Sequence, residues 1–283
     1  MRRSLKMSEN KNAVVIPIYQ TSLSAEELFS ISNAATVLAK HDIHLVGPDH
    51  LSGFLAKLST KYNRPIRYKT FPDHYFAGIA GYNALMLSSM FYRAFTNYQY
   101  ILIAQTDSLV FSDTLDDWAA KGYSYIGAPW FEGYTQPIKP LRLDCVGNGG
   151  FSLRNIADFL RVLDRPRVFK NTLMETWPGS WVSNTYRYVK DYHSFVYKNL
   201  HLNIDVNEDL FWSLFVSPRC EFFTIPTASE AVSFAFEAHP EYLFELNKQQ
   251  LPFGCHAWER YNPEFWRMLF EKNNILQNRT KTQ

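Results

Sequence analysis

The chain has 283 residues, of which 46% are hydrophobic, and its formal net charge at pH 7 is +2. This length fits one large α/β domain or two small ones, and the near-neutral charge excludes a basic surface of the size that nucleic-acid binding requires. Aromatic residues make up 16% of the chain, which suits sugar binding because tyrosine and tryptophan rings stack on pyranose faces.

Cysteine usage and hydropathy indicate the compartment. Cys145, Cys220 and Cys255 are odd in number and none has C-x-x-C spacing, which favours a reducing environment over a disulfide or zinc scaffold. No apolar run approaches the roughly 18 residues of a membrane span, and the N-terminus lacks an apolar signal-peptide core. We expect a cytoplasmic protein with at most peripheral contact at the inner face of the membrane.

The first half of the chain alternates strands and helices. Ser24 and Glu27 form a capping-box pattern that opens a helix running to about His41, and residues 82–95 have helical periodicity. Short apolar runs predict strands at residues 13–18 and Tyr100–Ala104, and two further strands are predicted between them, at Ile43–Gly47 and Ile66–Phe71. This alternation predicts an α/β fold with a mostly parallel sheet and helices on both faces.

The second half is less regular, and residues 165–200 are predicted to form an insertion of mixed structure. Strands are predicted at Tyr123–Ala128, Asp144–Arg154 and Phe222–Ile225. Helices are predicted to begin after Asn155, after Asn207 and at Asn262-Pro263, because asparagine caps a helix start and proline suits its first position.

Gln105, Thr106 and Asp107 follow the fully apolar strand that ends at Ala104. Ligands of open α/β sheets bind at this end of the strands. A buried aspartate there needs a partner, and a divalent cation bridging it to a diphosphate would meet that need. A turn or capping role for Asp107 is equally compatible with the spacing.

Three glycines within Gly147-Asn148-Gly149-Gly150 allow another group to approach the backbone closely, and exposed amides there would line a sugar or phosphate. The run is neither a P-loop nor a G-x-G-x-x-G motif, and a β-bulge would produce the same pattern.

Three further side chains are candidates for chemistry. Glu208 and Asp209 stand at a predicted helix start, where the helix dipole alone favours carboxylates, and either is a candidate general base. His256 lies in an aromatic setting and is a candidate metal ligand or diphosphate contact, with a hydrogen-bonded core histidine as the alternative.

In this order, the segments resemble a glycosyltransferase-like family with a Q/L-T-D strand end, IGAPW, GNGGFSLR, an E-D pair before a helix, and P-F-G-x-H-x-W. Here they stand at Gln105–Asp107, Ile126–Trp130, Gly147–Arg154, Glu208–Asp209 and Pro252–Trp258. The resemblance covers about residues 13–260 and implies the GT-A fold, a Rossmann-like half joined to a mixed acceptor-binding half. We expect one domain at 13–275, with a nucleotide-binding half at 13–130, an acceptor and catalytic half at 131–260, a flexible tail at 1–12 and a tail at 276–283.

The resemblance implies a metal-dependent hexosyltransferase that uses a nucleotide-sugar donor, UDP-linked by expectation. Asp107 and His256 would hold Mn²⁺ or Mg²⁺, although Gln105 replaces the first acid of the family's D-x-D motif. Asp209, or otherwise Glu208, would deprotonate the hydroxyl of a glycan or lipid-linked glycan acceptor, with inversion. The residues expected to contact the donor are Pro17, Tyr19, Gln20, Tyr82, Asn83, Gln105, Thr106, Asn148, Gly149 and Gly150.

Trp130, Trp177 and Trp181 are candidate acceptor platforms, and the expected process is synthesis of a surface polysaccharide such as O-antigen, capsule or lipopolysaccharide. Two other functions stay open. A non-catalytic nucleotide- or carbohydrate-binding protein is compatible with Gln105. A sugar-phosphate nucleotidyltransferase fits less well, because residues 17–23 contain no glycine, lysine or arginine to bind a triphosphate.

Overall fold

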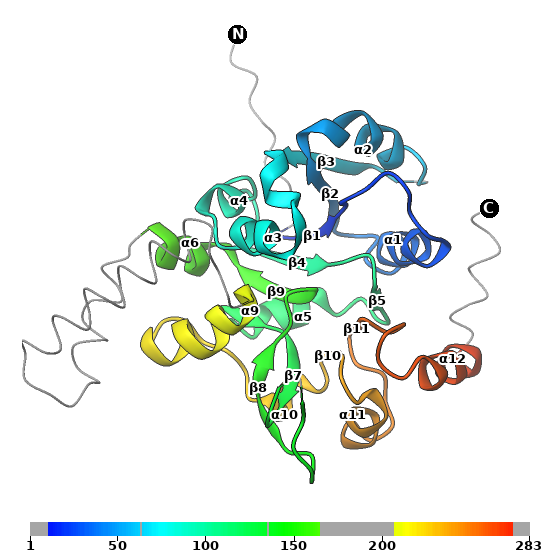
Figure 1. Cartoon of the computed structure of the whole chain (residues 1–283), viewed down its shortest axis with the longest axis vertical. Coiled ribbons are helices and arrows are strands. Elements are labelled where there is room, and N and C mark those ends of the chain that lie inside the picture. Colours follow the sequence, from blue (N-terminus) through cyan, green and yellow to red (C-terminus); the bar gives the residue numbers. More distant parts are fainter. Residues whose placement is uncertain (1–10, 63, 135, 165–206, 274–283) are drawn as a thin grey trace, which may run out of the picture.

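The computed structural model describes residues 11–62, 64–134, 136–164 and 207–273 (Figure 1). The predicted tails and the predicted insertion lie outside these residues, except for residues 11 and 12. The strands are β1 (Asn12–Pro17), β2 (Asp42–Pro48), β3 (Ile66–Phe71), β4 (Tyr100–Ala104), β5 (Ser108–Val110), β6 (Tyr125–Ile126), β7 (Ala128–Phe131), β8 (Leu143–Gly147), β9 (Phe151–Asn155), β10 (Ala235–Phe236) and β11 (Gly254–His256).

The α-helices are α1 (Ala25–Val37), α2 (Ser52–Ser59), α3 (Gly78–Met86), α4 (Ser89–Arg93), α5 (Leu115–Ala120), α6 (Ile156–Asp164), α9 (Glu208–Leu210), α10 (Ala228–Ala231), α11 (Pro240–Leu246) and α12 (Pro263–Lys272). Short 3₁₀ segments are η1 (Asp49–Leu51), η2 (Asp73–Phe76) and η4 (Ser217–Arg219), and η3 (Phe211–Val216) is a π-helix. None of the helices in the described ranges is both long and apolar enough to cross a bilayer.

A six-stranded sheet forms the centre of the molecule, in the order β3-β2-β1-β4-β9-β6. The first four strands in this order are parallel, whereas β9 is antiparallel to both of its neighbours. The prediction of a mostly parallel central sheet is therefore confirmed. Since β1 and β4 run in the same direction, the segments that follow Pro17 and Ala104 emerge at the same edge of the sheet.

Successive side chains of β1 enter two different cores, as the period-two geometry of a strand requires. Val14 and Ile16 pack with residues of α1, α2 and α5, whereas Ala13 and Val15 pack with residues of α3, α4 and α6. Figure 1 shows these two groups of helices on opposite sides of the sheet. All of these strand residues are at most 1% exposed, so both faces of the sheet are covered, as predicted.

Two small sheets extend the central one. In one of them, β5 lies antiparallel to β11, and β11 lies parallel to β10. The other is the antiparallel hairpin of β7 and β8, which projects away from the central sheet in Figure 1. The three-stranded sheet brings the C-terminal part of the chain to the edge where β4 ends.

Local signals placed several helix boundaries correctly. Ser24 and Glu27 make both hydrogen bonds of a capping box at the start of α1. Asn155 accepts a hydrogen bond from the Asp158 amide at 3.1 Å at the start of α6, and Asn262 caps α12. These contacts confirm the predicted caps, because each side-chain oxygen satisfies an amide that the first turn leaves free.

Three predicted elements are wrong because local breaks divide them. The helix predicted over residues 82–95 is two helices, α3 and α4, and the Ser88 hydroxyl caps the second. The strand predicted over 123–128 breaks at Gly127, where a Cβ would overlap the Gly147 carbonyl oxygen, so that β6 and β7 enter different sheets. The strand predicted over 144–154 is β8 and β9, separated by a turn at Asn148–Gly150.

Two further predictions fail around residues 207–225. No strand forms at Phe222–Ile225, and the Thr224 carbonyl instead accepts hydrogen bonds from the Ser124 and Tyr125 amides. The Asn207 side chain does not cap a helix but accepts a hydrogen bond from Asn83 Nδ2 at 3.4 Å. The helix after it continues as the π-helix η3.

The stability of the fold is expected to depend on pH through His44 in β2. Its side chain is 3% exposed and its Nε2 lies 2.9 Å from the Tyr98 hydroxyl. Burial, together with the charges of Lys69 and Arg67, lowers the pKa of His44 from 6.5 to about 4. The unfolded chain therefore binds more protons between these values, so stability is full above pH 6.5 and falls as the pH drops towards 4.

We expect His44 to account for a loss of about 3 kcal/mol of unfolding free energy between pH 7 and 4, measured by urea titration. The His44→Gln variant should lose this part of the pH dependence, whereas His50→Gln at an exposed position should keep it. An unchanged slope in His44→Gln would contradict the assignment.

Candidate active site

A cavity of about 670 Å³ opens at the edge of the sheet where β1 and β4 end. Ten of the residues predicted to act in the site line it, namely Tyr19, Tyr82, Asn83, Gln105, Asn148, Gly149, Gly150, Glu208, Asp209 and His256. Pro17, Gln20, Thr106 and Asp107 are not among its lining residues, although Asp107 contacts the lining residue His256. Pro17 is buried within β1, Gln20 is exposed, and the Thr106 hydroxyl donates to Glu27 of α1 at 3.1 Å.

The pairing of β5 with β11 brings Asp107 and His256 together from distant parts of the chain. His256 is the register partner of Ser108, the residue after Asp107. As a result His256 Nε2 lies 3.2 Å from an Asp107 carboxylate oxygen and 3.3 Å from Gln105 Oε1. On the other side of the ring, His256 Nδ1 lies 2.8 Å from Glu237 Oε1.

This arrangement sets the charge of the pair. Burial lowers the pKa of His256, but its hydrogen bonds with Asp107 and Glu237 outweigh burial and raise the pKa to about 10. Burial raises the pKa of Asp107, but the hydrogen bond and charge of His256 outweigh that effect and leave the pKa lowered. Without a bound cation, the two side chains therefore form an ion pair at neutral pH.

The same two atoms fit a divalent cation. An octahedral ion with ligand distances of about 2.1 Å has neighbouring ligands about 3 Å apart, close to the observed 3.2 Å. In the described part of the chain, no group of three or more histidine, cysteine, aspartate or glutamate side chains is arranged to hold a metal. A cation at Asp107 and His256 would thus need oxygen atoms of a ligand or water to complete its shell.

The glycine run allows three side chains to lie against its backbone. A Cβ at Gly150 would overlap the His256 ring, and a Cβ at Gly147 would overlap the Trp130 ring. A Cβ at Gly149 would lie 2.6 Å from Glu208 Oε1. The close approach predicted for this run is therefore made by the protein's own side chains.

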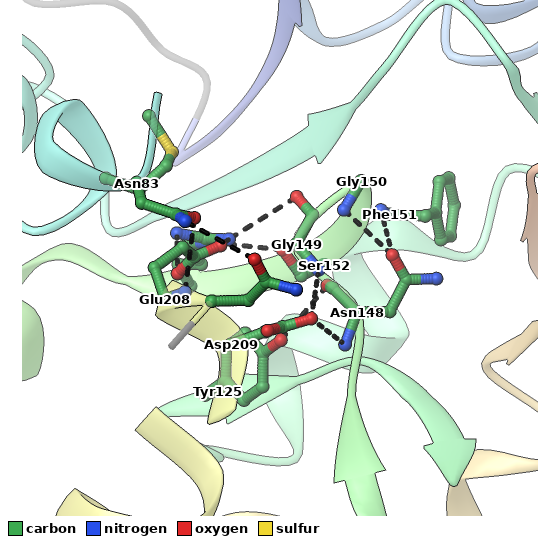
Figure 2. Close-up of polar contacts among 12 residues, drawn as sticks. Asn83, Tyr125, Asn148, Gly149, Gly150, Phe151, Ser152, Glu208 and Asp209 are labelled. Carbon is green, nitrogen blue, oxygen red and sulfur yellow. Dashed lines mark hydrogen bonds and ion pairs between the residues drawn. The ribbon is translucent and has the colours of Figure 1, made fainter. Parts of the chain in front are cut away.

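The amides of this run are not free to line a ligand, contrary to the sequence-based expectation (Figure 2). The Asn148 and Gly149 amides donate to Asp209 Oδ2, both at 3.2 Å. The Gly150 and Phe151 amides donate to the Asn148 side-chain oxygen at 2.8 and 3.1 Å. The sequence could not reveal this, because the acceptors come from a turn with Asn148 at φ 94° and from a helix about 60 residues away.

Asp209 is held at the cavity by these bonds, and its Oδ1 also accepts from the Leu210 amide at 2.8 Å. Burial, followed by the charge of Glu237, raises the pKa of Asp209 above its usual value, although the amide hydrogen bonds act in the opposite direction. A raised pKa suits a carboxylate that must accept a proton.

The side chain of Glu208 forms an ion pair with Arg154 of β9. The side chains are 2% and 0% exposed, and two parallel bonds join them, Arg154 Nη2 to Oε1 at 2.6 Å and Nη1 to Oε2 at 3.1 Å. Arg154 also donates to the Tyr92 hydroxyl and the Gly149 carbonyl. Both carboxylate oxygens of Glu208 are thus engaged, whereas the neighbouring Asp209 is held by amides alone.

Aromatic side chains form the walls of the cavity. Tyr19 lies edge-on to Phe76 and Tyr82, with ring centroids 6.0 and 5.6 Å apart. Trp130 lies edge-on to Tyr134 at 5.5 Å. Trp130 therefore lines the cavity, which is where an acceptor platform has to lie. The other two candidates, Trp177 and Trp181, lie outside the described residues.

Two charged lining residues, Glu237 and Arg260, were missed in the sequence. Glu237 follows the two-residue strand β10, which has no recognisable motif. Arg260 lies in the turn after β11, four residues after His256, and belongs to no recognisable motif. Its charge contributes to the lowered pKa of Asp107.

The buried ion pair yields a stability prediction. Glu208→Gln leaves the Arg154 charge buried without a counter-charge and is expected to cost about 3–5 kcal/mol of unfolding free energy in denaturant titrations. Replacing both partners, with Arg154→Met and Glu208→Leu, should recover most of that loss. The control is Asp164→Asn, which breaks an exposed pair with Arg93 and should cost less than about 1 kcal/mol. Equal costs for the two single variants would contradict the prediction.

No curated protein matches the chain. Among solved structures, an active-site mutant of LgtC has a TM-score of 0.51 at 11% identity, over 87% of this chain and 86% of that one. Apo GlyE, a glycosyltransferase of Streptococcus pneumoniae TIGR4, has a TM-score of 0.46 at 12% identity, over 88% of this chain and 54% of that one. The chain thus spans about half the length of GlyE. Mouse xyloside xylosyltransferase 1 has a TM-score of 0.46 at 9% identity, over 87% and 97% of the two chains.

The likeness to LgtC shows the fold, which is the GT-A fold of glycosyltransferases, as expected from the order of the motifs. A family model described as "Protein of unknown function (DUF5672)" matches residues 65–256. This range contains Asp107, the glycine run, Asp209 and His256. Because the match covers more than half of the chain, the protein belongs to the DUF5672 family.

Proposed function

We propose that this protein is a metal-dependent glycosyltransferase that moves a hexose from a nucleoside-diphosphate sugar, with UDP as the expected nucleotide, to a glycan hydroxyl. The observation that carries the proposal is that one cavity is lined both by His256, which forms a cation-compatible pair with Asp107, and by Asp209, a carboxylate whose pKa is raised. A GT-A fold provides the scaffold for this combination.

The charges around the cavity indicate that a diphosphate would bind there together with a cation. Glu208, Asp209 and Glu237 are the acidic residues among the described lining residues, and Arg260 is the one lysine or arginine among them. Asp107 adds a further carboxylate beside the lining residue His256. A diphosphate entering beside these carboxylates would be repelled unless more positive charge were present. A divalent ion on Asp107 and His256 would supply that charge and would leave coordination positions for diphosphate oxygens.

The roles of the chain's own residues follow from this placement. Tyr19 and Tyr82 would bound the nucleotide end of the donor, and Asn148 would face the sugar, since its Nδ2 has no hydrogen-bond partner among the described residues. Arg260 would interact with the diphosphate as it leaves. When bound, Mn²⁺ or Mg²⁺ would act as a Lewis acid that neutralises the leaving diphosphate.

Asp209 would accept the proton of the acceptor hydroxyl as its oxygen attacks the anomeric carbon. The three amides that hold Asp209 fix the direction of its carboxylate, and the raised pKa makes it a stronger base than an exposed aspartate. One displacement with one base inverts the anomeric configuration. Glu208 would support this step as the partner of Arg154.

The acceptor side would be bounded by Trp130, whose ring lies against Gly147, next to the loop that holds Asp209. A tryptophan face offers a stacking surface to a pyranose ring. This favours a carbohydrate acceptor, free or lipid-linked, and we place the reaction in surface polysaccharide synthesis, at the cytoplasmic side of the membrane.

The first test asks whether activity depends on a divalent metal. A panel of nucleotide-sugars is assayed for nucleotide release by the purified protein, with Mn²⁺ and with EDTA. We expect release from at least one donor, its loss with EDTA and its recovery with added Mn²⁺. Asp107→Asn should reduce the rate roughly 100-fold or more, because the leaving diphosphate loses its charge partner.

Asp117→Asn, at an exposed position on α5, is the matched control and should retain the wild-type rate. Activity that persists in EDTA would exclude a role for the metal. Binding of a donor without any release or transfer would instead support the non-catalytic binding protein.

The second test asks whether Asp209 is the general base. Asp209→Asn should lower kcat by about 10²–10⁴-fold and leave the KM for the donor nearly unchanged. Because the base must be deprotonated, kcat/KM should fall as the pH drops through the pKa of Asp209, at a pH above the usual aspartate value of 3.8. NMR of the product should show an inverted anomeric configuration, and retention would exclude the single displacement.

A further inference from the structure

Glu237 is a partly buried carboxylate to which the mechanism above assigns no role. It directly follows β10, and the parallel pairing of Phe236 with Cys255 sets it beside His256. Its side chain is 17% exposed and that of His256 is 14% exposed, so the contact between them is largely shielded from water. A buried carboxylate is costly unless a partner compensates its charge.

The contacts of the His256 ring are different on its two nitrogens. Nδ1 lies 2.8 Å from Glu237 Oε1, whereas Nε2 faces Asp107 and Gln105 at 3.2 and 3.3 Å. The ring also lies against Gly150, where any side chain would collide with it. A flip of the ring would turn Nδ1 away from Glu237 and break the shortest of these contacts.

We propose that Glu237 is a positioning residue. Its carboxylate accepts a hydrogen bond from the Nδ1–H of His256, and so directs the Nε2 lone pair to the cation shared with Asp107. This inference rests on the proposed function, because it assigns a role towards the cation of that site. Carboxylates that hold the second nitrogen of a metal-binding histidine fix its tautomer and increase its strength as a ligand.

Neither of the other roles open to Glu237 agrees with its contacts. As a direct ligand it would need to reach the Nε2 side of the ring, but its Oε1 is bound at Nδ1. As the base it would compete with Asp209, which the loop amides hold at the cavity while Glu237 is hydrogen-bonded to a histidine.

Glu237 should strengthen cation binding at His256. A His256 ring protonated on both nitrogens and a ring with a cation on Nε2 both carry a proton on Nδ1. Glu237 therefore accepts the same hydrogen bond in both states, and its negative charge favours a divalent ion more than a proton. Removal of Glu237 should weaken cation binding.

The test measures Mn²⁺ alone, by titrating the protein and following free Mn²⁺ by electron paramagnetic resonance at one fixed pH. Glu237→Ala should weaken Mn²⁺ binding by about 10–100-fold. Glu237→Gln keeps an oxygen that can accept the hydrogen bond from Nδ1–H, and it should recover a large part of the Mn²⁺ affinity. Glu245→Ala, an exposed glutamate on α11, is the control and should bind as the wild type does. Thermal melts establish that each variant is folded.

The outcomes separate the inference from the function on which it rests. Wild-type affinity in Glu237→Ala, with weakened binding in Asp107→Asn, would overturn the positioning role and leave the cation site intact. Equal losses in the alanine and glutamine variants would also overturn it, because the hydrogen bond would then have no part. If Asp107→Asn binds Mn²⁺ as the wild type does, or the wild type binds none, the cation site and the inference both fall.

Discussion

The site depends on one buried interaction, the bidentate ion pair of Arg154 and Glu208. It joins β9 of the central sheet to the first turn of α9, in which Asp209 is the next residue after Glu208. Because both charges are out of water, neither partner can move away without leaving the other uncompensated. The position of Asp209 is thereby fixed by an interaction in which Asp209 takes no part.

The loop from Gly147 to Gly150 is a second constraint, and its chemistry differs from that of a phosphate-binding loop. Its amides are satisfied by Asp209 and by the Asn148 side chain, and its glycines make room for Trp130, Glu208 and His256. The loop thus acts as a connector. It sets Asp209, His256 and Trp130 at fixed positions relative to one another.

Much of this could be predicted from residue patterns. Apolar runs placed β1 and β4, and Ser24, Asn155 and Asn262 placed helix starts, because these signals are local. Elements were misjudged where a contact distant in sequence decided the outcome, as at Gly127 against Gly147 and at Asn207 against Asn83. The same holds for the site. Asp107, Asp209 and His256 stood out by motif order, whereas Glu237 depends on the register of β10 and β11, which no local pattern contains.

The pairing of β5 with β11 has a consequence for how the protein is made. Asp107 and His256 are brought into contact by the pairing of two short strands whose segments are about 150 residues apart. A nascent chain on the ribosome can complete the parallel part of the sheet long before β11 is synthesised. Until then Asp107 lacks its contact with His256, so this contact forms only when nearly the whole described part of the chain has been translated.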